Sequence, residues 1–198
     1  MKKLLLLPIT ALLITSCGEE PKNELEAQEN IAENIEAGAV YGPVDYNDGL
    51  LAEITILEVK IQMLEDLDAK DVPTEEMVAA CKESMAEYDK VLTALNKIEP
   101  YGVKGDEFKQ AVIELVKHTG KVISLYNEYS SILSVPDADW TNENAQIWDD
   151  AYNAIYDDYE IANDKCIEVQ GQYASLNNMS LDYTGATAEE IYEESIAK

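Results

Sequence analysis

The chain has 198 residues, of which 40 are acidic and 14 are basic, so its formal net charge is −26 at pH 7. All 14 basic residues are lysines, and nucleic-acid binding depends on Lys and Arg side chains that neutralise phosphates. The composition therefore argues for no nucleic acid among the partners, and it opposes contact between the acidic surface and anionic lipids.

Residues 1–16 have the pattern of a bacterial export signal peptide. Lys2 and Lys3 precede an apolar run over 4–14, which is too short to span a bilayer, since a span needs ~20 residues. The run ends in Ile14-Thr15-Ser16-Cys17, which resembles the lipobox, whose cysteine becomes the lipid-modified first residue of a mature lipoprotein. The alternative is a plain secretory signal with an incidental cysteine. We expect lipidation at Cys17, and two or more acyl chains give a lasting membrane anchor.

Residues 17–44 are predicted to form a lipidated acidic tether between the anchor and the folded domain. The stretch from Gly18 to Val44 contains seven glutamates and one lysine. It could reach ~90 Å if fully extended. A thin apolar stripe over 24–37 could form a helix before Gly38 ends it.

Four later segments repeat apolar residues at intervals of three and four, which is the seam of a packed helix. Further apolar residues beside each seam widen the stripe to the breadth that a bundle requires. No strand pattern is present. In chain order the seams cover residues 50–64, 77–98, 108–133 and 145–176.

Turn-forming residues separate these segments. Pro73, Pro100 and Pro136 lie in the three short connections, and Thr74, Asp106 and Thr141 are the predicted N-caps of the helices that follow. Short connections join antiparallel neighbours. The sequence therefore predicts an all-α fold, an up-down-up-down antiparallel four-helix bundle over 45–179 with an N-terminal tether.

The C-terminal tail, residues 180–198, has one helical signal. Thr187-Ala188-Glu189-Glu190 matches a capping box and could begin a short helix containing Ile191 and Ile196. The sequence leaves open whether this piece docks on the bundle or frays.

Three short motifs suggest a family. Tyr46-Asn47-Asp48 opens the first helix, 105–109 opens the third, and Asn177-Asn178-Met179 closes the fourth. Over residues 45 to 181 this order resembles an uncharacterised surface-lipoprotein family of Bacteroidota and leptospires, which has no established activity. The resemblance implies a helical bundle on a lipid anchor, and it supplies no catalytic residues. The Glu19-Glu20 pair is similar to acidic signals that send Bacteroidota lipoproteins to the cell exterior, so we expect an outer-membrane location that faces outward.

Residues that carry chemistry are sparse. The single histidine, His118, follows Glu114 by four residues, and a di-iron bundle would need Glu-x-x-His motifs on two helices. No phosphate-binding loop, nucleophile elbow or catalytic triad is present. We therefore expect no enzymatic activity, no cofactor and no metal site. In the predicted bundle Cys81 and Cys166 lie at different heights, too far apart for a disulfide, so we expect two free buried thiols.

Tyrosine is unusually frequent, with 12 tyrosines against one phenylalanine. Counting along the helices places several rings at the end of the bundle farthest from the tether. They either pack structurally or form a recognition site, because such rings are enriched at interface hot spots. Two functions compete, a surface-displayed binding module for an envelope or extracellular protein or a small ligand, and a structural or assembly accessory of an envelope complex. The candidate binding residues are Trp140, Trp148, Tyr126, Tyr129 and Tyr152.

Overall fold

The computed structural model describes residues 42–181 and 188–197, and these ranges contain helices and turns with no strand. The all-α prediction is therefore confirmed. The predicted signal peptide, Cys17, almost all of the predicted tether and Thr187 lie outside the described residues.

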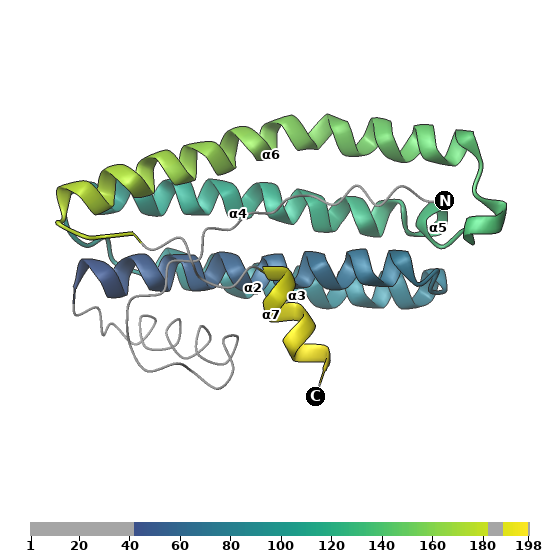
Figure 1. Ribbon diagram of the computed structural model, residues 1–198, viewed down its shortest axis with the longest axis horizontal. Helices are drawn as coiled ribbons and strands as arrows, with labels where there is room; N and C mark the ends of the chain where they lie inside the picture. Colours follow the sequence, from purple (N-terminus) through teal and green to yellow (C-terminus); the bar gives the residue numbers. More distant parts are fainter. Residues whose placement is uncertain (1–41, 182–187, 198) are drawn as a thin grey trace.

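Four long helices lie side by side along the length of the molecule (Figure 1). A short helix, a 3-10 turn and a C-terminal helix accompany them. The long helices are α2 (Pro43–Ala69), α3 (Thr74–Lys97), α4 (Gly105–Glu128) and α6 (Asn142–Leu176), and the short elements are α5 (Ser130–Leu133), η1 (Asp137–Asp139) and α7 (Ala188–Ile196).

One of the three predicted N-caps is confirmed. Thr141 caps α6, because its hydroxyl accepts a hydrogen bond from the backbone N–H of Asn144 at 3.1 Å. The predictions for Thr74 and Asp106 as caps are wrong in detail, although both helices begin there. Pro73 holds the cap position of α3, and Lys104, in the left-handed region at φ 62°, holds that of α4, so both predicted caps lie inside the first turn. The first long helix begins at Pro43, two residues before the predicted start of the bundle, because proline is well suited to a first helical position.

The helices pack unequally on one another. α4 contacts both α3 and α6, whereas α2 contacts α3, α4 and α7. α2 and α6 meet through long side chains, for example where Gln170 Nε2 donates to Asn47 Oδ1 at 2.9 Å in the buried interior. As a result, α2 is covered on most sides and buries polar residues as well as its apolar seam.

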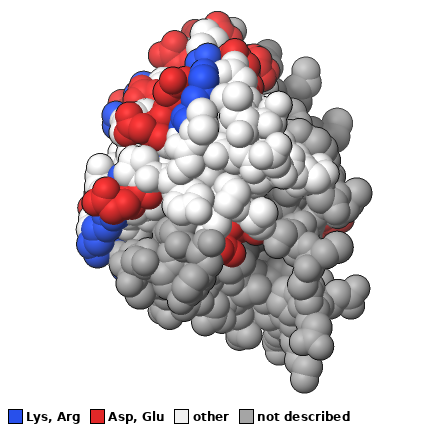
Figure 2. Space-filling model, turned by 90° about the vertical axis from the view of Figure 1, so that its left-hand side faces the viewer, with Lys and Arg blue, Asp and Glu red and all other residues white. Residues whose placement is uncertain are grey.

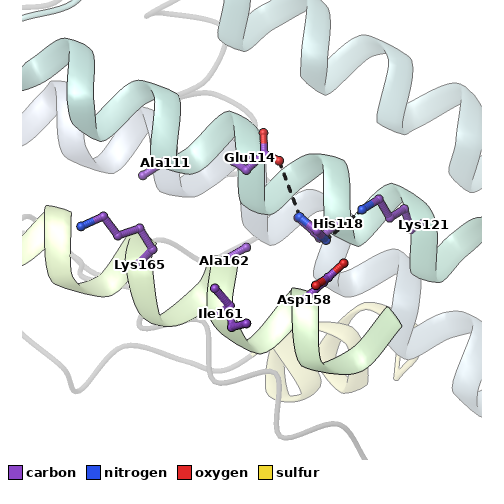
Figure 3. Close-up of a pocket in the computed structure, with 8 residues that line it drawn as sticks. All are labelled: Ala111, Glu114, His118, Lys121, Asp158, Ile161, Ala162 and Lys165. Carbon is purple, nitrogen blue, oxygen red and sulfur yellow. Dashed lines mark hydrogen bonds and ion pairs between the residues drawn. The ribbon is translucent and has the colours of Figure 1, made fainter. Parts of the chain in front are cut away.

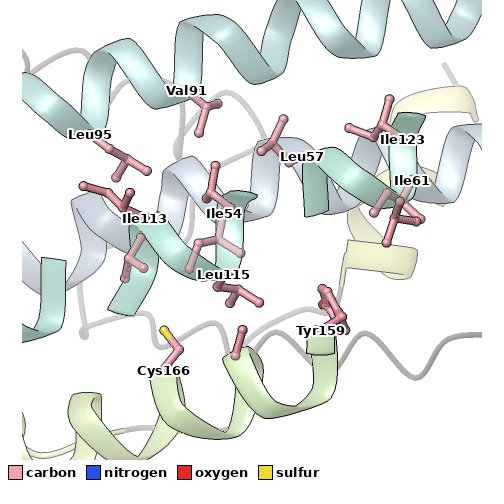
Figure 4. Close-up of a cluster of buried hydrophobic side chains, with 14 of the residues drawn as sticks. Ile54, Leu57, Ile61, Val91, Leu95, Ile113, Leu115, Ile123, Tyr159 and Cys166 are labelled. Carbon is pink, nitrogen blue, oxygen red and sulfur yellow. The ribbon is translucent and has the colours of Figure 1, made fainter. Parts of the chain in front are cut away.

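The core runs through the middle of the helices and is made of interleaved aliphatic side chains (Figure 4). Ile54 and Leu57 of α2 face Val91 and Leu95 of α3, and Leu115 of α4 lies between α2 and α6. A close approach of α3 to α4 depends on Gly120, because a Cβ there would fall on the Tyr88 ring. The seams predicted from sequence are therefore the buried faces, except at the end of the fourth seam, where the prediction for Leu176 is wrong because this last residue of α6 has no helix packed over it and is exposed.

The C-terminal helix docks on α2. Ile191 is buried, whereas Ile196 is exposed. The Tyr192 hydroxyl donates to the Asp66 carboxylate at 2.8 Å. This contact answers the question that the sequence left open, since α7 is held against the side of α2 rather than frayed.

Candidate functional site

One end of the molecule brings together the start of α2, the α3–α4 turn and the end of α6, and we call it the Pro43 end. The Tyr46 hydroxyl donates to the Gly105 carbonyl at 2.7 Å, and the Tyr173 hydroxyl donates to the Pro43 carbonyl at 3.3 Å. These two hydrogen bonds fix where the chain enters α2.

The opposite end, the Trp140 end, contains the α2–α3 turn and the connection from α5 to α6. The backbone N–H of Asp137 donates to the Asp71 carboxylate at 3.3 Å and ties the two turns together. Exposed acidic side chains surround this end, and they include Glu75, Glu76, Glu128, Asp137, Asp139 and Glu143.

Four of the five candidate residues form one cluster, and the fifth, Trp140, packs against the core from the connection that precedes α6. The Trp148 ring is the centre of a cluster, with ring-centroid distances of 5.3 Å to Tyr126, 6.2 Å to Tyr129 and 5.9 Å to Tyr152. Tyr126, Trp148 and Tyr152 are buried, whereas Tyr129 and Trp140 are only partly buried against the core. The buried rings pack as core, so Tyr129 and Trp140 are the members of the set with surface available to a partner.

The hydroxyls of Tyr126 and Tyr152 in this cluster are held neutral. Burial raises the pKa of Tyr126 well above its usual value, and the nearby Glu65 carboxyl adds to the effect. Burial also raises the pKa of Tyr152, which stacks on Tyr156 at 5.5 Å. A phenol that stays protonated can donate a hydrogen bond but cannot act as a base at neutral pH. The cluster therefore offers rings and neutral donors.

A second aromatic cluster, at the Pro43 end, was missed by the sequence analysis. Phe108 lies 5.3 Å from Tyr173 and 6.3 Å from Tyr46 between ring centroids, and all three rings are fully buried. Tyr46 precedes the regular seam of its helix, so apolar periodicity gave no signal for it. Phe108 lies near the start of α4 and Tyr173 near the end of α6, so in an antiparallel pair these two rings are expected at the same end of the molecule. That expectation could have indicated the cluster from the sequence.

A shallow groove lies between α4 and α6 and has a volume of about 450 Å³ (Figure 3). The His118 imidazole lies in it, with Nε2 3.6 Å from a Glu114 carboxylate oxygen and Nδ1 accepting from Lys121 Nζ at 3.2 Å. Ile161 projects beside this cluster and is 68% exposed. The lining residues are Ala111, Glu114, His118, Lys121, Asp158, Ile161, Ala162 and Lys165.

The groove combines both charge signs with an apolar rim. Lys165 pairs with Glu168 at 2.7 Å, and Glu114 also pairs with Lys117 at 3.1 Å, so these charges are partly satisfied within each helix. The described residues that line the groove include no serine, threonine or cysteine. The arrangement suits docking of a polar group with an apolar neighbour better than it suits general acid–base chemistry.

The interior also contains titratable groups. Cys81 and Cys166 are free and buried, as predicted, and burial raises the pKa of their thiols to about 11 and about 12. Glu58 is buried near Tyr159 and Cys166, and its Oε2 has no hydrogen-bond partner. Desolvation raises the pKa of Glu58 to about 8, so this carboxyl is protonated at neutral pH.

The described residues form neither a metal site nor a membrane-spanning helix. Within 42–181 and 188–197, no three His, Cys, Asp or Glu side chains come together in a way that could hold a metal ion. In the same ranges, no helix has the length and hydropathy needed to cross a bilayer.

Comparisons with family models, with curated proteins and with solved structures gave no match. The function therefore has to be argued from the residues and their geometry.

Proposed function

We propose that this protein is a bacterial lipoprotein, anchored through Cys17 to the outer membrane and facing the cell exterior, that acts as a non-enzymatic binding module. The support for the anchor is the order of a positive region, a short apolar run and a lipobox-like motif at the start of the chain.

We further propose that α2, α3, α4 and α6 form an up-down-up-down antiparallel four-helix bundle. The pairing of α2 with α3, α3 with α4 and α4 with α6 supports this topology, because successive helices joined by short connections pack as antiparallel neighbours. The arrangement differs from a symmetric bundle because α2 and α6 pack less closely than the other neighbouring helices.

The observation that carries the binding role is the position of Trp140 and Tyr129. Both rings are partly exposed at the end of the molecule opposite to the entry of the tether at Pro43. Partly exposed aromatic rings surrounded by acidic side chains suit a partner that is apolar with a basic rim. The partner is an envelope or extracellular protein or a small ligand.

The anchor is tested by replacing Cys17 with serine. We expect Cys17→Ser to leave an unprocessed precursor or to release the protein from the membrane fraction, measured by fractionation and palmitate labelling. Palmitate incorporation that persists in this variant would rule out Cys17 as the lipid site.

The binding surface is tested with Trp140→Ala. If Trp140 serves recognition, the variant keeps a melting temperature close to that of the wild type and loses partners that co-purify with the native lipoprotein after mild detergent extraction. A large loss of stability with unchanged co-purification would show that Trp140 is a structural plug.

The second candidate function, an assembly accessory, is favoured by Ile161 on α6. Its side chain is 68% exposed beside the groove on the side of α6, where a larger complex could pack. Ile161→Ser is the matched variant for Trp140→Ala. Partners lost through Ile161→Ser and kept in Trp140→Ala would favour assembly through the helix face over binding at the end.

A further inference from the structure

The Pro43 end carries an exposed apolar face. Val103 is 56% exposed, Leu176 is 49% exposed and Tyr101 is 39% exposed. Val103 and Tyr101 come from the α3–α4 turn, and Leu176 is the last residue of α6. Figure 2 views this end and shows a broad uncharged area, with lysine and acidic side chains at its upper and left rims.

The face is held in a fixed shape. The backbone N–H of Val103 donates to Asn177 Oδ1 at 2.9 Å, and Asn177 Nδ2 donates back to the Val103 carbonyl at 2.9 Å. Gly102 has a φ of 76°, and a Cβ there would collide with the Asn177 side chain. The turn and the end of α6 therefore form one preorganised surface rather than two independent loops.

The two sides of this face differ in charge. Residues 175–181, at the end of α6, contain no charged side chain, although the chain has 40 acidic residues. The α3–α4 turn, over 98–107, contributes the exposed acids Glu99, Asp106 and Glu107 together with Lys104. The α6 side of the face therefore approaches a surface at the lower electrostatic cost, because no charge has to be brought close to that surface there.

The same end receives the chain from its anchor. Pro43 begins α2 there and accepts the hydrogen bond from Tyr173, so the predicted tether joins the body beside the apolar face. A tether raises the effective concentration of the face at the membrane, so a contact too weak to bind alone becomes sufficient. Tyrosine with small aliphatic neighbours is typical of residues that sit at the membrane–water interface.

We propose that this face is a membrane-contacting surface, in which Tyr101, Val103 and Leu176 rest in the headgroup region of a zwitterionic bilayer and hold the body with its Trp140 end pointing away. The proposal rests on the lipid anchor of the proposed function and adds to it an orientation. The contact requires no anionic lipid, because the face carries no lysine cluster to recognise one.

The test uses the full chain, processed in its host and reconstituted into phosphatidylcholine vesicles that contain a nitroxide-labelled lipid. A fluorophore is placed on Val103→Cys, with Ala138→Cys at the exposed opposite end as the matched control. Cys81 and Cys166 are buried and an acylated Cys17 is blocked, so the new cysteine is the thiol that reacts under native conditions. We expect quenching of the Val103 probe by about twofold, since interfacial residues enter the bilayer by about 5–10 Å, and no quenching of the Ala138 probe.

A second variant checks that the apolar side chains cause the contact. Adding Tyr101→Ser and Leu176→Ser to the labelled Val103→Cys chain should reduce the quenching to the level of the Ala138 control while flotation with the vesicles persists. Quenching that persists in this variant would overturn the proposal.

The remaining outcomes are also decisive. If the chain floats with the vesicles but neither probe is quenched, the anchor stands and the proposed orientation is overturned. Equal quenching of both probes leads to the same conclusion. The Val103 probe could also be shielded from solvent without being quenched by the labelled lipid. If the chain then sediments as a dimer, the face is the contact with a second copy of the chain, and the membrane proposal is overturned. If the chain does not float, the anchor fails, and a histidine tag on nickel-chelating lipid then holds the same labelled chain so that the two probes still decide the orientation.

Discussion

Each end of this protein is closed by aromatic rings, but the two ends are built differently. At the Pro43 end, Tyr46, Phe108 and Tyr173 are fully buried, and both hydroxyls donate to backbone carbonyls. At the Trp140 end, the cluster around Trp148 continues outward to Tyr129 and to Tyr156, whose hydroxyl donates to Glu160.

The difference shows that aromatic content by itself does not identify a binding surface. Rings whose faces and hydroxyls are all satisfied internally have nothing left to offer a partner. The exposed aliphatic side chains follow the opposite order. The Pro43 end presents Val103 and Leu176, which are 56% and 49% exposed, whereas the Trp140 end presents Ile147, which is 39% exposed, and carboxylates around its partly exposed rings.

The largest expected effect tests whether the two clusters differ in packing. Phe108→Ala should lower the free energy of unfolding by about 4 kcal/mol, because the ring is fully buried between Tyr46 and Tyr173. Tyr129→Ala should cost only about 1 kcal/mol, because that ring is partly exposed. Denaturant unfolding of both variants measures the difference. Equal losses would remove the contrast between the ends.

The second prediction concerns Glu58, which lies on α2 between the two ends of the molecule, near Tyr159 and Cys166 of α6. The folded carboxyl stays protonated up to its pKa of about 8, whereas in the unfolded chain it ionises near the ordinary value of 4.5. Stability is therefore fully retained below about pH 4.5 and falls as the pH rises toward 8. Glu58→Gln should add nothing at pH 4 and several kcal/mol above pH 8, measured by thermal or denaturant unfolding.

Glu83→Gln is the matched control for this pH experiment. Glu83 is exposed and pairs with Lys60 at 2.7 Å, and the hydrogen bond from Lys60 lowers the pKa of its carboxyl. Its replacement should change stability by no more than about 0.5 kcal/mol. If Glu58→Gln raised the free energy of unfolding equally at pH 4 and pH 9, ionisation of the Glu58 carboxyl would not be the cause of the stabilisation.

The smallest expected effect tests the acidic character of the Trp140 end. Glu128 is the last residue of α4, which has no basic residue in its last turn. Glu128→Lys should stabilise by about 0.5 kcal/mol, because a cation complements the helix dipole at a C-terminus. Glu75→Lys, in the first turn of α3 at the same end, should destabilise by a similar amount. Both changes should shrink in high salt, and two shifts of the same sign would indicate that net charge dominates over the helix ends.

Much of the fold could be predicted from the sequence because the helices are amphipathic. The seams of α3, α4 and α6 place one residue in every three or four on the buried side, and that spacing needs no partner to be recognised. The free state of Cys81 and Cys166 followed from helix lengths alone. The caps of α3 and α4 were missed because a proline and a left-handed lysine replace side-chain capping there.

The candidate site was only partly predictable. Sequence spacing placed Trp148, Tyr126 and Tyr152 at one end of the molecule, but it could not separate buried rings from the partly exposed Tyr129 and Trp140. Which of these rings are buried depends on how the ends of the helices pack against one another. The same reason explains why the cluster of Tyr46, Phe108 and Tyr173 and the face at Val103 gave no signal.

The sequence by itself determined the helical class, the positions of the connections, the buried seams and the acidic balance, because each depends on local spacing or on composition. Only the tertiary structure decided how completely α2 is buried. Its Glu58, Asn47 and Thr55 look like solvent-facing residues in the sequence, yet they are buried because α3, α4, α7 and the long side chains of α6 cover the helix. The tertiary structure also decided which end is apolar, since that surface joins a turn to a helix terminus 74 residues away.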